Sequence, residues 1–334
     1  MSRILVTGGL GYIGSHTCVA LVEAGHTPVV IDNLRNARRE TQQAIEGLTG
    51  QPLEFYELDS KDTRAVIQAV GSIDGVIHFA ALKSVGESVQ NPVEYYTENL
   101  ESLLSSIAVA EHCGAKTFIF SSSATVYGDT EASCVDETTP VGKPLNPYGH
   151  TKLLGERILQ SGSHSFKTLL LRYFNPIGAH PSARIGELPS GIPNNLVPYI
   201  TQTAAGIREQ LTVFGTDYPT RDGSCIRDFI HVCDLAEAHV AALNYSQHQV
   251  EPVDIFNVGT GQGNSVLELI HTFEEVNELK LNYAIGPRRE GDIDAIYTDT
   301  TKINTVLGWK SRYTLADSLK HSWEWEKYYR DTML

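Results

Sequence analysis

The 334-residue sequence is poor in features that hold small secreted proteins or zinc sites together. It has five cysteines, an odd number, scattered without any Cys-x-x-Cys spacing: Cys18, Cys113, Cys134, Cys225 and Cys233. This pattern argues against a disulfide framework and against a zinc site. We expect no metal ion, a reducing compartment, and cysteines that act as small buried hydrophobic side chains.

Long hydrophobic runs are also missing. No uninterrupted apolar stretch approaches the roughly 18 residues that a membrane-spanning helix needs. The chain begins Met1-Ser2-Arg3 and continues directly into Ile4-Leu5-Val6, without an apolar segment followed by a cleavage site. These observations predict a soluble, cytoplasmic protein that does not interact with membranes.

Positive charge is in the minority. Lysine and arginine number 26 against 40 aspartate and glutamate residues, which gives a formal net charge of −14. Such a chain repels a phosphate backbone, and no basic stripe interrupts the pattern, so nucleic-acid binding is excluded. A small anionic ligand would have to be held by a few local arginines.

Short apolar runs with helical stretches between them are what the sequence does contain. Continuous runs of this kind are typical of buried parallel strands and predict an α/β fold, a Rossmann-like doubly wound parallel sheet. Ligands bind beyond the carboxyl ends of such strands. Gly8, Asp32, Ala80, Ser121 and Asn175 each follow one of the runs, which are Ile4-Leu5-Val6, Pro28-Val29-Val30-Ile31, Val76-Ile77-His78-Phe79, Phe118-Ile119-Phe120 and Leu169-Leu170-Leu171.

The pattern changes near residue 177. Prolines and glycines become frequent there and break the alternation, which predicts a smaller, irregular α/β lobe. The segments Ile226 to Leu243 and Ile255 to Val258 again have the character of helix and strand, and we expect them to return to the first lobe. The predicted division is 1–176 plus about 226–258 for the first domain, and 177–225 plus 259–334 for the second.

A glycine-rich turn follows the first predicted strand. The segment Gly9-Leu10-Gly11-Tyr12-Ile13-Gly14, preceded by Gly8, opens the helical stretch Ser15 to Ala24. Glycines allow a tight turn and a close backbone approach, and the helix N-terminus offers free amides to a pyrophosphate. In this context the motif predicts a dinucleotide site.

Two acidic residues follow the next strands. Asp32 lies 18 residues after Gly14, where a carboxylate binds the adenosine ribose hydroxyls and repels a 2′-phosphate, so NAD is favoured over NADP. Nearby arginines leave NADP open: Arg35, Arg38 and Arg39. Asp59 has two interpretations, a contact with the adenine amino group or a helix N-cap before Thr63.

The segment Tyr148-Gly149-His150-Thr151-Lys152, about 25 residues after Ser121-Ser122-Ser123, predicts a tyrosine base beside a nicotinamide. A phenol with a pKa near ~10 accepts a proton at neutral pH only if positive charge lowers that value. Tyr148 and Lys152 are four apart, so they share a helix face, and Lys152 is placed to lower the pKa of Tyr148 while Ser123 approaches from a strand end.

These blocks resemble the extended short-chain dehydrogenase/reductase family, and within it the branch of UDP-glucose 4-epimerases, over nearly the full length. Other segments that carry the resemblance are His78-Phe79-Ala80-Ala81-Leu82-Lys83, Arg172-Tyr173-Phe174-Asn175-Pro176, Gly191-Ile192-Pro193-Asn194-Asn195-Leu196, Arg227-Asp228-Phe229-Ile230-His231 and Pro287-Arg288-Arg289-Glu290-Gly291-Asp292.

The resemblance implies an isomerase that interconverts UDP-glucose and UDP-galactose on tightly held NAD, with an NAD-binding first domain and a UDP-sugar-binding second domain. Tyr148 is then the base for the sugar 4-hydroxyl, Ser123 hydrogen-bonds the same oxygen, and Lys152 binds the nicotinamide ribose. The motifs and the resemblance together place these residues around NAD: Gly8, Gly11, Tyr12, Ile13, Gly14, Asp32, Asn33, Leu34, Asn36, Asp59, Phe79, Ala80, Ala81, Lys83, Asn99, Ser121, Tyr148, Lys152 and Tyr173.

The resemblance also implies a set of anchors for the UDP-sugar. Asn175 and Asn195 hydrogen-bond the nucleotide sugar, Phe214 stacks on uracil, Arg227 and Arg289 meet the diphosphate, and Asp292 meets ribose. With the catalytic residues the full set is Lys83, Ser123, Tyr148, Phe174, Asn175, Asn195, Leu196, Thr212, Phe214, Arg227, Arg289, Asp292 and Ile296.

Ile296 stands where many bacterial epimerases have tyrosine. A smaller residue at that pocket wall admits N-acetylated sugars in this family, so UDP-N-acetylglucosamine epimerisation or dual specificity is an alternative. His150, between Tyr148 and Lys152, is expected to face solvent.

Two other functions use the same scaffold. A 4,6-dehydratase needs an Asp-Glu pair directly after the small hydroxyl residue, where this chain has Ala124-Thr125, so elimination is disfavoured. A non-catalytic NAD-binding regulator remains an alternative of a different class, although such a protein has no need of Ser123, Tyr148 and Lys152 together.

Apolar positions at helical spacing occur in Val93 to Cys113 and Tyr148 to Gln160. They fit core stripes, and in the family such helices pair across a two-fold axis, so a homodimer is expected. The positions are Leu100, Leu103, Leu104, Ile107, Leu153, Leu154 and Ile158.

Overall fold

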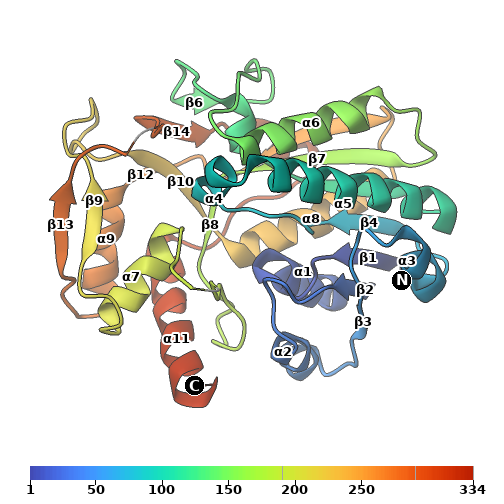
Figure 1. Cartoon of the computed structure of the whole chain (residues 1–334), viewed down its shortest axis with the longest axis horizontal. Helices are drawn as coiled ribbons and strands as arrows, with labels where there is room; N and C mark the ends of the chain where they lie inside the picture. The colour runs from blue at the N-terminus through green and yellow to red at the C-terminus, as the bar shows by residue number, and fades with distance from the viewer. Residues whose placement is uncertain (190, 290, 334) are drawn as a thin grey trace.

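A parallel sheet forms the larger lobe of the protein (Figure 1). The computed structural model describes residues 1–189, 191–289 and 291–333. Within these ranges seven strands pair in the order β11-β7-β5-β4-β1-β2-β3, every pair parallel. The predicted doubly wound sheet is confirmed, with its order reversing between β1 and β4. The strands are β1 (Arg3–Thr7), β2 (Thr27–Asp32), β3 (Glu54–Glu57), β4 (Gly75–His78), β5 (Thr117–Ser123), β7 (Lys167–Tyr173) and β11 (Val253–Val258).

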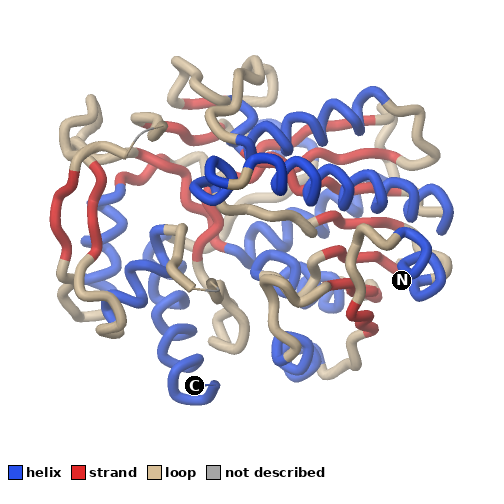
Figure 2. Tube along the Cα trace, viewed as in Figure 1, coloured by secondary structure: helices blue, strands red, loops and turns tan. Residues whose placement is uncertain are grey.

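Helices cover both faces of this sheet (Figure 2). On one face lie α3 (Thr63–Val70), α5 (Pro92–Cys113) and α6 (Pro147–Ser161). The short helix α4 (Val85–Gln90) comes directly before α5 in the chain. The other face packs against α1 (Tyr12–Glu23), α2 (Glu40–Thr49), α8 (Val232–Ser246) and α10 (Thr301–Val306). No helix within the described ranges has both the length and the apolar character to cross a bilayer.

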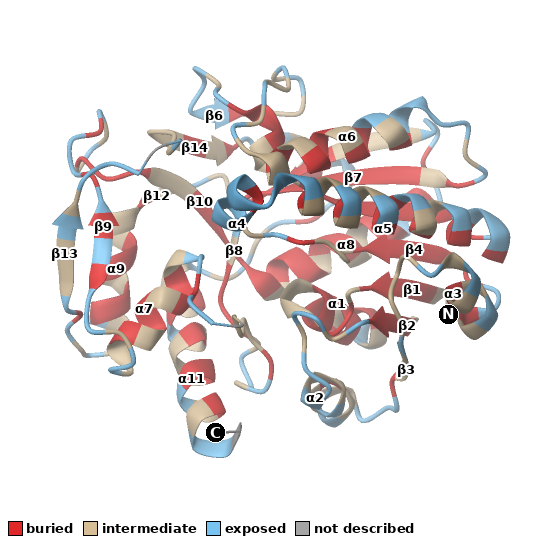
Figure 3. Cartoon of the chain, viewed as in Figure 1, coloured by how far each residue is buried: buried red, intermediate tan, exposed pale blue. Residues whose placement is uncertain are grey.

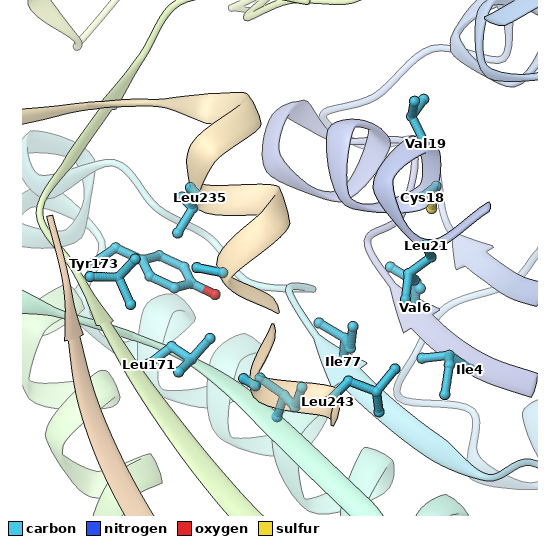
Figure 4. Close-up of a cluster of buried hydrophobic side chains, with 14 of the residues drawn as sticks. Ile4, Val6, Cys18, Val19, Leu21, Ile77, Leu171, Tyr173, Leu235 and Leu243 are labelled. Carbon is cyan, nitrogen blue, oxygen red and sulfur yellow. The ribbon is translucent and has the colours of Figure 1, made fainter. Parts of the chain in front are cut away.

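The central strands are largely apolar because alternate side chains enter two different cores. Ile4 and Val6 of β1 join the core beneath α1 and α8, whereas Leu5 joins the core beneath α5 and α6. Figure 4 shows the first of these cores, where Cys18 lies among the aliphatic side chains as the sequence predicted. Figure 3 shows the same burial along the strands of the larger lobe.

The second lobe contains smaller sheets. In the described residues β12, β10, β14 and β6 pair in that order, β8 adds to β10, and β13 pairs with β9. The strands are β6 (Cys134–Val135), β8 (Asn175–Ile177), β9 (Leu211–Phe214), β10 (Ile226–His231), β12 (Gly263–Ser265), β13 (Tyr283–Gly286) and β14 (Ala295–Thr298). The helices are α7 (Leu196–Ala204), α9 (Val266–Val276) and α11 (Leu315–Met333).

One predicted boundary is wrong in position. The sequence placed everything from Ile226 to Leu243 in the first lobe, but β10 pairs with β8, β12 and β14 of the second. Only α8, which packs against the sheet beside α1, returns to the first lobe. A strand and the helix that follows it have separate apolar faces, so their hydrophobic patterns alone do not show that they belong to different sheets.

Gly155 lets α6 approach the sheet closely. A Cβ at this position would lie 2.6 Å from Cζ of Phe120 on β5 and 3.1 Å from Leu103 of α5. Both neighbours are buried and well packed. The missing side chain therefore sets the distance between α6 and the end of β5.

We predict that Gly155→Ala destabilises the protein by about 1–3 kcal/mol, because the added methyl group overpacks a closed core. Gly86→Ala is the matched control, since a Cβ at this helical glycine meets no atom within 4 Å. Urea unfolding of both variants measures the difference. Equal midpoints for the two would contradict the close packing inferred for α6.

Candidate active site

The glycine turn lies where the strand order reverses. Gly8 follows β1 with φ of +67°, and a Cβ on it would lie 3.0 Å from the amide of Ala80, which follows β4. At Gly14 a Cβ would lie 2.8 Å from the Gly9 Cα. The turn thus folds back on the start of α1, and only glycine fits at these positions. The result is a helix N-terminus open to an anion.

Asp32 ends β2 beside this turn. Its carboxylate accepts hydrogen bonds from the amides of Leu10 (3.2 Å) and Leu34 (2.9 Å). Burial raises the pKa of Asp32, and these two bonds oppose the rise. Leu34 has φ of +58°, a left-handed conformation that is rare for leucine and that its bond to Asp32 helps to hold.

Each of the three arginines that left NADP open contacts another side chain of the protein. Arg35 pairs with Glu94 at 2.5 Å, and Arg39 pairs with Glu57. The Arg38 guanidinium lies 5.5 Å from the centre of the Tyr329 ring. Arg35 and Arg38 also line the cleft that contains Gly8 and Asp32.

Asp59 is not a helix N-cap. The N-cap of α3 is Asp62, whose side chain accepts from the amide of Ala65 at 3.0 Å. Asp59 instead accepts from the Asn33 side chain at 3.3 Å and from the amide of Lys61. These contacts place Asp59 at the cleft rim, as the other interpretation of the sequence requires.

Ser123, Tyr148 and Lys152 meet where α6 packs on the end of β5. The Lys152 ammonium donates to the Ser121 carbonyl at 2.6 Å and lies 5.8 Å from the centre of the Tyr148 ring. The Ser123 hydroxyl lies near enough to the Tyr148 phenol to affect its pKa, and it accepts from the amide of Thr125 at 3.2 Å. Asn146 caps the helix by accepting from the amide of Gly149 at 2.8 Å.

The electrostatic prediction for this pair is wrong for the protein alone. Burial raises the pKa of Tyr148 to about 12, and only the nearby Ser123 hydroxyl opposes the rise. Burial also lowers the pKa of Lys152 to about 8. Removing both groups from water disfavours both charges, and this outweighs their attraction while the ammonium is directed at the Ser121 carbonyl. At pH 7 the phenol is therefore protonated in the ligand-free protein.

A cleft of about 780 Å³ unites most of the predicted residues. It runs from the glycine turn past Tyr148 to the loop before α7. The predicted residues that line it are Gly8, Gly11, Tyr12, Ile13, Gly14, Asp32, Asn33, Asn36, Asp59, Phe79, Ala80, Ala81, Lys83, Asn99, Ser121, Ser123, Tyr148, Lys152, Tyr173, Phe174, Asn175 and Asn195.

Two of these residues support the cleft with their side chains. Asn99 is buried. Its side chain accepts from the Leu82 amide and donates to the Leu82 carbonyl and the Thr151 hydroxyl, so it ties the loop after β4 to α6. The Tyr173 hydroxyl donates to Nε2 of His239, whose Nδ1 donates to the Leu235 carbonyl. Sequence patterns assigned these residues to the cleft without showing that their polar groups are already used.

A second cluster lies outside that cleft. Arg289 pairs with Asp292 at 2.7 Å, and Arg227 approaches the same carboxylate at 3.7 Å. The Arg289 guanidinium lies 5.7 Å from the centre of the Phe214 ring, which is 44% exposed. Four residues predicted to hold the UDP moiety are thus neighbours. Glu290, within the same segment, lies outside the described residues.

The remaining predicted residues do not line the cleft. Thr212 is exposed on β9, and Leu34 and Leu196 pack partly into the cores. Ile296 is only 7% exposed and belongs to the same apolar cluster as Phe174. Phe174 is 6% exposed and does line the cleft, so the burial of Ile296 does not exclude a contact with the sugar, and its place at the pocket wall stays a prediction.

Sequence analysis missed Glu187. Its carboxylate accepts from the Lys83 ammonium at 2.8 Å and from the Asn195 amide at 2.6 Å, and it lines the cleft. A local pattern could not reveal it, since Lys83 is 104 positions away. His150 was also misplaced: it bonds the Tyr96 hydroxyl at 2.7 Å and does not simply face solvent.

Comparison with known proteins identifies the family of this chain. A model of the NAD dependent epimerase/dehydratase family matches residues 4–259. The chain belongs to the NAD dependent epimerase/dehydratase family. The UDP-glucose 4-epimerase of Bacillus subtilis is 49% identical over 97% of this chain and 96% of its own length. The family predicted from the sequence is confirmed.

Solved structures of family members have the same fold. A UDP-glucose 4-epimerase of Stenotrophomonas maltophila, with bound NAD and formylated UDP-arabinopyranose, superposes with a TM-score of 0.94 at 43% identity over 99% of both chains. That of Bifidobacterium longum, in complex with NAD⁺ and UDP, gives the same score, identity and coverage.

We predict that Gly14→Ala removes most of the dinucleotide bound to this family member, because a methyl group meets the Gly9 backbone at 2.8 Å and displaces the start of α1. Gly11→Ala is the graded control, since its nearest atom would be 3.2 Å away. Bound NAD per chain is measured after denaturation. Full retention in Gly14→Ala would contradict the predicted role of the turn.

Proposed function

We propose that the protein is an NAD-dependent epimerase that interconverts UDP-glucose and UDP-galactose by transient oxidation at sugar C4. The observation that carries the proposal is the meeting of Ser123, Tyr148 and Lys152 in a cleft that begins at the glycine turn. The relatives named UDP-glucose 4-epimerase support it. A regulator without catalysis would not need Ser123, Tyr148 and Lys152 together in this cleft.

The cleft suits NAD. The glycines leave space where a Cβ would clash, the start of α1 offers its amides to a pyrophosphate, and Asp32 stands ready for ribose hydroxyls. Pairing of Arg35 and Arg39 with carboxylates favours NAD over NADP. When bound, NAD supplies the hydride acceptor for sugar C4 and a positive charge that favours a phenolate.

Tyr148 then moves the proton of the sugar 4-hydroxyl. Its pKa of about 12 in the protein alone must fall for it to act as a base, and the Lys152 ammonium contributes to that fall once further positive charge is present. Ser123, which lies beside Tyr148, holds the same sugar oxygen. After the 4-keto sugar has turned over, hydride returns to C4 on the opposite face and Tyr148 gives the proton back to the oxygen.

Inversion requires a firm anchor and a loose sugar pocket. We assign the anchor to the neighbouring residues Arg227, Arg289, Asp292 and Phe214. The guanidinium groups of the two arginines suit a diphosphate. Asn175 and Asn195 face the cleft and hold the nucleotide sugar. Lys83 and Asn195 release Glu187 when they bind substrate.

We predict that the purified protein converts UDP-galactose to UDP-glucose without added cofactor, and that Tyr148→Phe lowers kcat by about 10²–10⁴-fold because proton transfer is lost. Lys152→Met also lowers kcat. Tyr96→Phe is the matched control, since it removes a hydroxyl bonded to His150 outside the cleft. Product analysis by chromatography decides. No conversion by the parent protein, or full activity of Tyr148→Phe, would disprove the proposal.

A parallel assay with UDP-N-acetylgalactosamine tests the second activity. Isoleucine at 296 is less bulky than tyrosine, which favours acceptance of the acetyl group, but its burial with Phe174 limits that effect. We expect a lower kcat/KM for the acetylated sugar. A ratio near one would make this protein a dual-specificity enzyme.

A homodimer and a cytoplasmic location complete the proposal. Apolar side chains are exposed along α4 and α5, at Val85, Val89, Val93 and Leu104, with exposures of 45, 61, 76 and 51%. Leu103 and Leu153 of the predicted stripe belong instead to the cores of the chain. The five cysteines are all free thiols, which supports a reducing compartment.

We expect Leu104→Glu to convert the dimer to a monomer, because it places a charge in an apolar interface. Val250→Glu is the matched control at an 82% exposed valine away from α4 and α5. Light scattering at micromolar concentration gives the mass. A parent protein that is monomeric would refute the dimer.

A further inference from the structure

A buried ion pair lies directly behind the catalytic residues. Glu156 of α6 and Arg172 of β7 have side chains that are 2% and 4% exposed. Arg172 grips both carboxylate oxygens, Nε to Oε1 at 2.9 Å and Nη2 to Oε2 at 2.7 Å. The Ser122 hydroxyl donates to Oε1 of the same carboxylate at 2.5 Å. None of these side-chain groups has a role in the proposed reaction.

Further hydrogen bonds connect this bidentate pair, the fork, to the surrounding core. The remaining Nη1 of Arg172 donates to the Tyr127 hydroxyl at 3.1 Å, which donates in turn to the Asn257 side chain at 2.7 Å. The network therefore joins α6, β5, β7, β11 and the 3₁₀ turn η1 (Ala124–Tyr127). Because each member is buried and bonded, the network allows little movement of the elements it joins.

The ion pair lies on the same side of α6 as the proposed reacting groups. Tyr148, Lys152 and Glu156 follow one another at intervals of four, so they lie on one side of α6. They face three consecutive residues of β5. Lys152 donates to the Ser121 carbonyl, Glu156 accepts from the Ser122 hydroxyl, and Tyr148 lies beside Ser123. Ser122 and Arg172 are register partners, so their side chains share the sheet face on which α6 packs.

We propose that Glu156 and Arg172 are positioning residues, which fix α6 on the end of β5 so that Tyr148 meets Ser123 and Lys152 meets Ser121. The bidentate fork adds a directional constraint to the apolar packing at Gly155, because it fixes an angle as well as a distance. A buried ion pair of this kind adds little stability over apolar residues of equal volume, so its value lies in geometry. The inference rests on the proposed epimerase activity.

The test compares kcat and KM for UDP-galactose. In the double variant Glu156→Leu with Arg172→Met we expect kcat to fall about 10- to 100-fold while KM changes little, since the anchoring residues are untouched and only the reacting groups shift. Arg172→Lys keeps the charge without the fork, and we expect it to lose kcat as well. Circular dichroism and bound NAD confirm that each variant is folded.

A milder pair of variants decides the matter should the double variant not fold. Ser122→Ala removes one tie to Glu156 and leaves no unpaired charge. Ser246→Ala is its control, because it removes a buried hydroxyl bonded to Thr117 at the opposite end of β5. We expect a lower kcat only for Ser122→Ala.

Equal kcat for Ser122→Ala and Ser246→Ala, or unchanged kcat in a folded double variant, would overturn the positioning role. A proportional loss of kcat and bound NAD would indicate a merely structural role and overturn it too. An inactive parent protein would instead refute the epimerase activity itself, which separates the two failures.

Discussion

The packing of α6 on the carboxyl end of β5 is the constraint on which the site depends. Gly155 allows the helix to lie against Phe120, and the Lys152 ammonium binds the Ser121 carbonyl at 2.6 Å. The same packing brings Tyr148 beside Ser123. The helix is also tied to α5, where the Asn99 amide bonds Thr151 at 3.0 Å. The catalytic groups are therefore held by core packing and not by a loop.

Burial governs the electrostatics of the same place. It raises the pKa of Tyr148 to about 12 and lowers that of Lys152 to about 8, because a low-dielectric site disfavours both charges. At neutral pH the phenol of the protein alone is therefore protonated.

The residues proposed to hold the substrate and NAD form two separate sets. The cleft from Gly8 to Asn195 belongs mainly to the larger lobe, and the cluster of Arg227, Arg289 and Asp292 belongs to the second. In a chain of net charge −14 these arginines are a local exception, and each is already oriented by Asp292. Glu187 connects the parts by accepting from Lys83 of one lobe and Asn195 of the other.

The sequence by itself determined the doubly wound sheet, the glycine turn, Asp32, and the trio at 123, 148 and 152. Each depends on short spacings, apolar runs and backbone space, which are local properties of a chain. It missed the short strand β3, whose Glu54–Glu57 contains only two apolar residues, and it put β10 in the wrong lobe. Only the tertiary structure decided the pKa values of Tyr148 and Lys152 and the burial of Ile296 beside Phe174. It also decided the pairing of Glu187 and the buried fork of Glu156 and Arg172. These depend on which distant side chains meet and how much water they lose, and no spacing along the chain encodes either quantity.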